Sequence, residues 1–86
     1  MTQITDAEIL EKIRTVITLH TGISEDKINL ETSFYEDLNA DSLDIIELTL
    51  RFEQSFKLDM AEEDSLKLRT VGDMVTYVKT KLSEQK

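Results

Sequence analysis

The chain has 86 residues, no cysteine, and a net charge of −8 from 18 acidic and 10 basic residues. A chain of this length forms one small domain, which folds without disulfides or a thiolate zinc site. The negative charge argues against nucleic acid and anionic membranes as partners, because both attract Lys and Arg rather than carboxylates.

The N-terminal residues 1–8 are polar and acidic, unlike a signal or transit peptide. No apolar run approaches the roughly 20 residues that span a bilayer. We therefore expect a cytoplasmic monomer, or a mature form from which a targeting segment has been removed. A strongly negative field also steers a chain toward basic patches on other proteins, although solubility alone is an alternative explanation.

The first predicted helix covers residues 6–20 and ends at Gly22, which supplies a left-handed stop. Thr5 and Glu8 have the spacing of a capping box. Apolar residues recur at helical intervals along it: Ile9, Leu10, Ile13, Val16 and Ile17. His20 falls near this apolar side, which predicts a partly buried or capping side chain rather than a catalytic one. Because His20 is the only histidine, no cage of imidazoles is available, and we predict no metal site.

Residues 23–40 show no sustained period and are predicted to form a long ordered loop. Its apolar anchors are expected to be Ile28, Leu30, Phe34 and Leu38. Further helices are predicted over residues 42–56, over the short segment 60–66, and from about Thr70 onward, where Val71, Met74, Val75, Val78 and Leu82 share one side. Strand signals are absent. The predicted fold is all-α: one domain, residues 1–86, forming a small four-helix bundle with a long loop between the first and second helices and a short third helix.

The second predicted helix has two apolar sides. Its broad side, expected to face the core, carries Ile45, Leu48, Phe52 and Phe56, with Thr49 at the edge. The opposite side carries Leu43, Ile46 and Leu50, which are flanked by acids. An apolar strip with an acidic rim is typical of a surface that docks a partner protein. The alternative is that another helix covers this strip.

Ser42 opens this helix, where free N–H groups and the helix dipole favour a phosphate. No neighbouring residue in the sequence would deprotonate it, and no Gly-x-Ser-x-Gly elbow is present. A lone serine at a helix start is most often a cap. The sequence contains no pairing of catalytic groups, and we predict no enzymatic activity and no catalytic residues.

Four blocks of sequence together resemble the acyl carrier protein family over residues 9–78. They are Phe34-Tyr35-Glu36-Asp37-Leu38, Asp41-Ser42-Leu43, Leu43-Asp44-Ile45-Ile46-Glu47-Leu48, and residues 70–78. The resemblance implies a four-helix bundle in which Ser42 receives phosphopantetheine from coenzyme A through a phosphopantetheinyl transferase. It also implies that the arm carries acyl groups as thioesters between acyl-transfer, condensing and other basic-faced enzymes of fatty-acid or polyketide synthesis.

The resemblance further implies that partners dock on the start and outer side of the second helix. The residues at the family's docking positions are Asp41, Leu43, Asp44, Ile46, Glu47, Leu50 and Glu53. Arg51 is placed near Asp44 and Glu47 at spacings that allow pairing within the helix, and we expect it to tune partner choice.

Two departures from the family pattern bear on this assignment. Asn39 stands where the family commonly has Gly, and asparagine tolerates a left-handed conformation, so the turn is expected to survive. Residues 51–56 are less acidic than in housekeeping fatty-acid carriers. Two alternatives therefore stay open: a specialised carrier for an aminoacyl or secondary-metabolite group, and, in another class, a small acidic adaptor without a prosthetic group.

Overall fold

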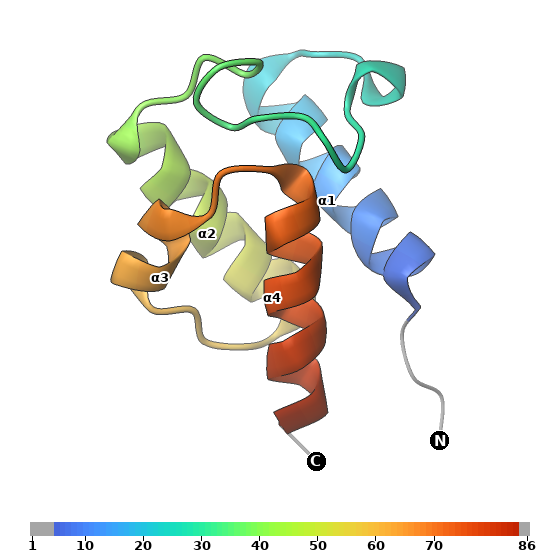
Figure 1. Cartoon of the computed structure of the whole chain (residues 1–86), viewed down its shortest axis with the longest axis vertical. Coiled ribbons are helices and arrows are strands. Elements are labelled where there is room, and N and C mark those ends of the chain that lie inside the picture. Colours follow the sequence, from blue (N-terminus) through green and yellow to red (C-terminus); the bar gives the residue numbers. More distant parts are fainter. Residues whose placement is uncertain (1–4, 85–86) are drawn as a thin grey trace.

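The computed structural model describes residues 5–84, which form four α-helices joined by loops (Figure 1). The elements are α1 (Asp6–Thr21), the 3₁₀ turn η1 (Glu25–Lys27), α2 (Ser42–Phe56), α3 (Glu62–Lys67) and α4 (Val71–Glu84). The all-α fold, the long loop before α2 and the short α3 are as predicted. Residues 1–4 and 85–86 of the predicted domain lie outside the described residues.

The ends of α1 are set by local hydrogen bonds that the sequence predicts. The Thr5 hydroxyl accepts from the Glu8 N–H at 3.2 Å, and the Glu8 carboxylate accepts from the Thr5 N–H at 2.8 Å. This reciprocal pair satisfies two donors that the first turn of the helix leaves free. At the other end Gly22 has φ 82°, and its N–H donates to the Thr18 carbonyl at 2.8 Å.

The helices pack around one hydrophobic core. α1 contacts both α4 and α2, and α3 contacts α2. Figure 1 shows α1 and α4 side by side, with the long loop crossing the end of the bundle where α1 finishes and α2 begins. The most deeply buried apolar side chains are Ile9, Ile13, Ile17, Ile28, Phe34, Leu48, Phe52, Val71 and Val78. Among the described residues, no helix is long and apolar enough to cross a membrane.

The long loop is anchored partly by side chains and partly by its main chain. Ile28, Phe34 and Leu38 are buried, as predicted. The prediction for Leu30 was wrong, because its side chain is 50% exposed. Leu30 instead contributes its carbonyl, which accepts the Gly72 N–H at 2.8 Å.

Two more main-chain hydrogen bonds join the loop to the segment that leads into α4. The Phe34 N–H donates to the Arg69 carbonyl at 2.8 Å, and the Val71 N–H donates to the Thr32 carbonyl at 2.9 Å. An isolated antiparallel bridge between Ser33 and Thr70 lies in this region, and the described residues form no β-strand. The loop that precedes α2 is therefore held in place by α4.

The predicted boundaries of the last two helices differ slightly from those observed. α3 begins at Glu62 rather than at Met60, because its N-cap Ala61 is extended, with ψ 135°, and Met60 lies in the preceding loop. α4 begins at Val71, immediately after Thr70.

Candidate functional site

The first turn of α2 is closed by a reciprocal pair of aspartates. The Asp44 N–H donates to Asp41 Oδ1 at 3.0 Å, and the Asp41 N–H donates to Asp44 Oδ2 at 3.2 Å. Asp41 is therefore the N-cap, and Ser42 is the first residue of the helix. The hydroxyl of Ser42 is not needed as a cap, which removes the ordinary structural explanation for a serine at this position.

Ser42 is exposed, and no described residue hydrogen-bonds its hydroxyl. The main-chain N–H groups of Ser42 and Leu43 also have no partner among residues 5–84, whereas those of Asp44 and Ile45 are bonded to Asp41. Two unpaired donors beside an exposed hydroxyl, at the positive end of the helix dipole, fit a phosphodiester attached to Ser42.

The turn before Asp41 presents this helix start outward. Asn39 has φ 55°, the left-handed conformation that asparagine tolerates, so the replacement of the usual Gly leaves the turn intact. The next residue, Ala40, is buried, and its N–H donates to the Phe34 carbonyl at 2.9 Å. The chain is therefore fixed on the core one residue before the cap of α2.

The two apolar sides of α2 are separated as predicted. The core side is buried: Ile45, Leu48, Thr49, Phe52 and Phe56. On the outer side Leu43 is 69% exposed and Leu50 is 54% exposed, while Ile46 is half-buried. None of the described helices covers Leu43 or Leu50, so the alternative of a covered strip is wrong for these two residues.

The charged residues around this strip differ in their exposure and in the contacts that they make. Asp41, Glu47 and Arg51 are exposed, whereas Asp44 and Glu53 are partly buried. Glu53 Oε2 accepts the Met60 N–H at 2.8 Å, a contact that fixes the loop after α2 and that the sequence did not predict. Arg51 forms no ion pair with any of residues 5–84, so its expected pairing with Asp44 and Glu47 is not formed.

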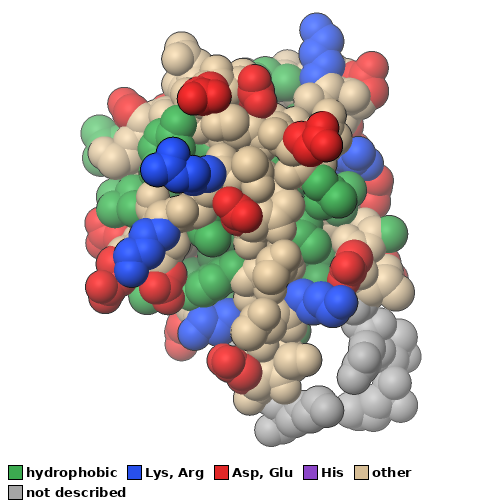
Figure 2. All heavy atoms as spheres, viewed as in Figure 1, with side chains coloured by type: hydrophobic (Ala, Val, Ile, Leu, Met, Phe, Trp, Pro, Cys, Tyr) green, Lys and Arg blue, Asp and Glu red, His purple; other side chains and the backbone are tan. Residues whose placement is uncertain are grey.

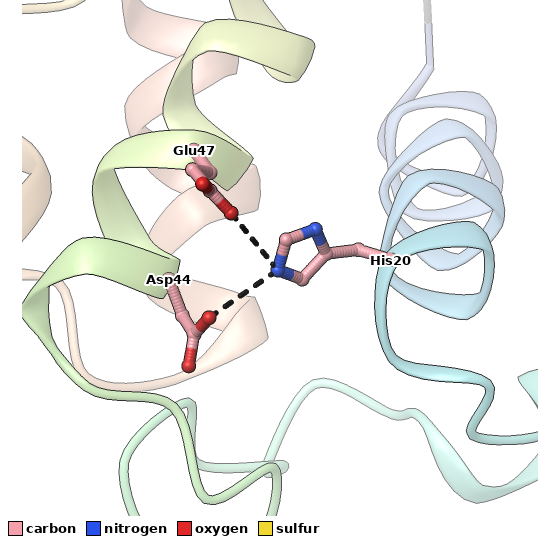
Figure 3. A group of neighbouring side chains, drawn as sticks. All are labelled: His20, Asp44 and Glu47. Carbon is pink, nitrogen blue, oxygen red and sulfur yellow. Dashed lines mark hydrogen bonds and ion pairs between the residues drawn. The ribbon is translucent and has the colours of Figure 1, made fainter.

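Asp44 and Glu47 turn toward His20 at the end of α1 instead (Figure 3). His20 Nε2 lies 3.5 Å from Asp44 Oδ1 and 3.7 Å from Glu47 Oε1. The Asp41 N–H first, and His20 second, hold the pKa of Asp44 below its ordinary value. The partial burial of His20 was predicted, but its acidic neighbours were not. The signal is topological: when consecutive helices run antiparallel, the last turn of one lies beside the first turn of the next.

Two shallow hollows lie at the ends of α2. One, of about 370 Å³, is lined by Leu50, Glu53, Gln54, Lys57, Leu58 and Asp59. The other, of about 270 Å³, is lined by His20, Thr21, Leu38, Asn39, Ala40, Asp44 and Leu48. On the face shown in Figure 2, acidic and basic side chains are interspersed, so negative charge does not form one block there.

Comparisons with known proteins agree with the helical fold. A family model described as "Phosphopantetheine attachment site" matches residues 11–78. An acyl carrier protein of Chlamydia felis is 43% identical over 74 residues, which cover 86% of this chain and 95% of that protein. An acyl carrier protein of Chlamydia caviae is 42% identical over 71 residues, covering 83% and 92% respectively. The solved structure of an acyl carrier protein from Enterococcus faecalis superposes with a TM-score of 0.75 at 34% identity, covering 90% of this chain and 98% of that one.

Proposed function

Because the chain belongs to the acyl carrier protein family, we propose that Ser42 carries the covalent phosphopantetheine group. On this proposal the chain presents acyl intermediates to enzymes of fatty-acid or polyketide synthesis. The main supporting observation is that Ser42 is exposed in the first turn of α2 and does not cap the helix, because Asp41 is the N-cap.

The residues around Ser42 define what the chain itself contributes. Asp41 and Asp44 are engaged with each other's main-chain N–H groups, so the base that deprotonates Ser42 is assigned to the transferase. The Ser42 and Leu43 N–H groups are available to bind the phosphodiester. The attached group supplies a terminal thiol that holds the acyl chain as a thioester. The protein then raises the effective concentration of this tethered substrate at each partner enzyme.

Partner enzymes are proposed to dock on the outer side of α2. Leu43, Ile46 and Leu50 supply the apolar strip, and two of them are more than half exposed. The acidic rim consists of Asp41, Asp44, Glu47 and Glu53. A complementary partner therefore has a basic surface with an apolar centre, which favours rapid and selective association. Glu53 contributes less to docking, because one of its oxygens is held by the Met60 N–H.

One observation favours the specialised carrier as the second candidate. Arg51 is exposed and unpaired among the described residues, and it places a positive charge in an otherwise acidic rim. An enzyme that expects an unbroken acidic surface should bind this chain less well, whereas a partner with an acid facing Arg51 should prefer it.

Intact-mass measurement tests the proposal against the adaptor alternative. The full chain is incubated with coenzyme A, magnesium and a broad-range phosphopantetheinyl transferase. A carrier gains the mass of one phosphopantetheinyl group per chain. An unchanged mass, with a known carrier protein modified in the same reaction, would favour the adaptor.

A further inference from the structure

Three potential metal ligands from two helices converge where α1 ends and α2 begins. His20 belongs to the last turn of α1, and Asp44 and Glu47 lie one turn apart at the start of α2. Figure 3 shows both carboxylates pointing at the same imidazole nitrogen. One donor atom from each residue lies within 4.8 Å of the other two.

The distances suit a shared ion better than direct hydrogen bonds. His20 Nε2 is 3.5 Å from Asp44 Oδ1 and 3.7 Å from Glu47 Oε1, which is long for a hydrogen bond. In a tetrahedral zinc site with bonds of about 2.0–2.1 Å, neighbouring ligand atoms are about 3.4 Å apart. The carboxylate oxygens of Asp44 and Glu47 lie within 4.8 Å of each other, so an ion at the centre requires the two carboxylates to move closer together.

The surroundings also prepare these side chains to bind. The Asp41 N–H holds Asp44 Oδ2, which leaves Oδ1 directed at His20. A hydrogen bond of this kind to a ligating carboxylate fixes its orientation, as in known metal sites. The His20 side chain is only 15% exposed, whereas that of Glu47 is 63% exposed. The site is thus rigid on one side and open to incoming ions on the other.

The chemistry of the donors selects the kind of ion. An imidazole nitrogen with two carboxylate oxygens is typical of zinc and similar transition metals. Magnesium and calcium prefer oxygen ligands only. The sequence predicted no metal site because it has one histidine, but the fold brings that histidine beside two carboxylates. We propose that His20, Asp44 and Glu47 form a three-ligand site for Zn²⁺ that joins the end of α1 to the start of α2.

Occupancy of this site has a consequence for partner binding, which rests on the proposed function. Asp44 and Glu47 belong to the acidic rim proposed for docking, and a bound Zn²⁺ neutralises their charge. Zinc should therefore weaken association with basic-faced partners in the wild-type chain but not in His20→Gln. The existence of the site is tested without any partner, so the two proposals fail separately.

The test is calorimetric titration of ZnCl₂ into the untagged full chain without its arm, because the thiol of the arm binds zinc itself. We expect one Zn²⁺ per chain and binding at least about tenfold weaker in His20→Gln and in Glu47→Gln. The exposed Glu47 provides a variant whose folding does not depend on the replaced side chain. Asp59→Asn, which removes one exposed charge after the far end of α2, is the matched control and should bind Zn²⁺ like wild type.

A second readout identifies the coordinating atom. In a long-range ¹H–¹⁵N spectrum of the imidazole, Zn²⁺ should shift the resonance of His20 Nε2, and a tenfold excess of Mg²⁺ should leave that shift unchanged. No zinc binding, equal affinity in His20→Gln and wild type, or displacement by Mg²⁺ would each overturn the proposal.

Discussion

Gly72 and Leu30 meet main chain to main chain. The Gly72 N–H donates to the Leu30 carbonyl at 2.8 Å, and a Cβ atom at position 72 would lie 2.9 Å from the same oxygen. Any side chain at this position therefore pushes the loop away from α4. Because that loop leads into the cap of α2, Gly72 helps to hold the Ser42 site in place from a distance.

Gly72→Ala is expected to destabilise the protein by about 1–3 kcal/mol, because the oxygen it meets belongs to the main chain and yields little. The sign of the change in unfolding free energy shows whether the contact with Leu30 is present. Without the contact, replacing a helical glycine by alanine stabilises by about 0.5–1 kcal/mol. Urea unfolding of the two proteins measures the difference, and a more stable Gly72→Ala would show that the loop does not rest on α4 in this way.

The contact between Gly72 and Leu30 is also an example of a structural feature that the sequence does not predict. Helical periodicity and capping residues are local signals. They predicted that α1 stops at Gly22 and that α2 begins at Ser42. Leu30 was predicted to anchor the loop with its side chain because it is apolar. Exposed leucines are common, however, and it is the Leu30 carbonyl that contacts Gly72. A main-chain contact of this kind leaves no side-chain pattern to read.

The candidate site was also predicted only in part. The helical wheel of α2 separated buried Leu48 from exposed Leu43 correctly, because one helix face must meet the core. The turn of Asp44 and Glu47 toward His20 was not predicted, because it depends on how α1 and α2 are placed beside each other. The same placement explains why Arg51 lacks the partners that spacing within the helix had suggested.

The two sides of α2 should respond differently to truncation. Leu48 is 1% exposed, and Leu48→Ala should cost about 2–5 kcal/mol of unfolding free energy because it leaves a cavity. Leu43 is 69% exposed, and Leu43→Ala should change stability by less than about 0.5 kcal/mol while slowing turnover by a partner enzyme. Thermal melts and loading rates measure both effects. Equal melting temperatures for the two variants would contradict the assignment of the faces.

Arg51 is expected to set the preference for partners. Arg51→Glu makes the rim continuously acidic, so association with generic basic-faced carrier-protein enzymes should become faster and more sensitive to salt. Stopped-flow association at two ionic strengths measures this, with Lys27→Glu, at an exposed position of η1 outside α2, as a charge-matched control. Unchanged rates across several partners would reduce Arg51 to an ordinary exposed charge.

Tyr77 links α4 to α3 and gives a prediction for alkaline pH. Its hydroxyl donates to Asp64 Oδ2 at 3.2 Å, and burial first, then Asp64, raises the pKa of Tyr77 above its ordinary value. The unfolded chain therefore loses this proton at lower pH than the folded chain does. The stability that Tyr77 contributes is present below its unfolded pKa and is lost as pH rises through its folded pKa.

Melting temperatures followed from pH 8 to about pH 11 should consequently fall less steeply in Tyr77→Phe than in wild type. Tyr35→Phe is the matched control, because the Tyr35 hydroxyl donates to the Leu66 carbonyl and not to a carboxylate. A slope that is the same in Tyr77→Phe and wild type would show that folding does not raise the pKa of Tyr77.

Ser42 alone is proposed to carry the prosthetic group, and intact mass after transferase treatment measures whether any other residue is modified. Wild type should gain one phosphopantetheinyl group. Ser24→Ala is the control and should gain one group as well, because Ser24 is exposed but its hydroxyl donates to Asp26 beside η1. Ser42→Ala should gain nothing and should stay within about 0.5 kcal/mol of wild-type stability, since Asp41 still caps α2. A phosphopantetheinyl gain on folded Ser42→Ala would show that the group is attached to another residue.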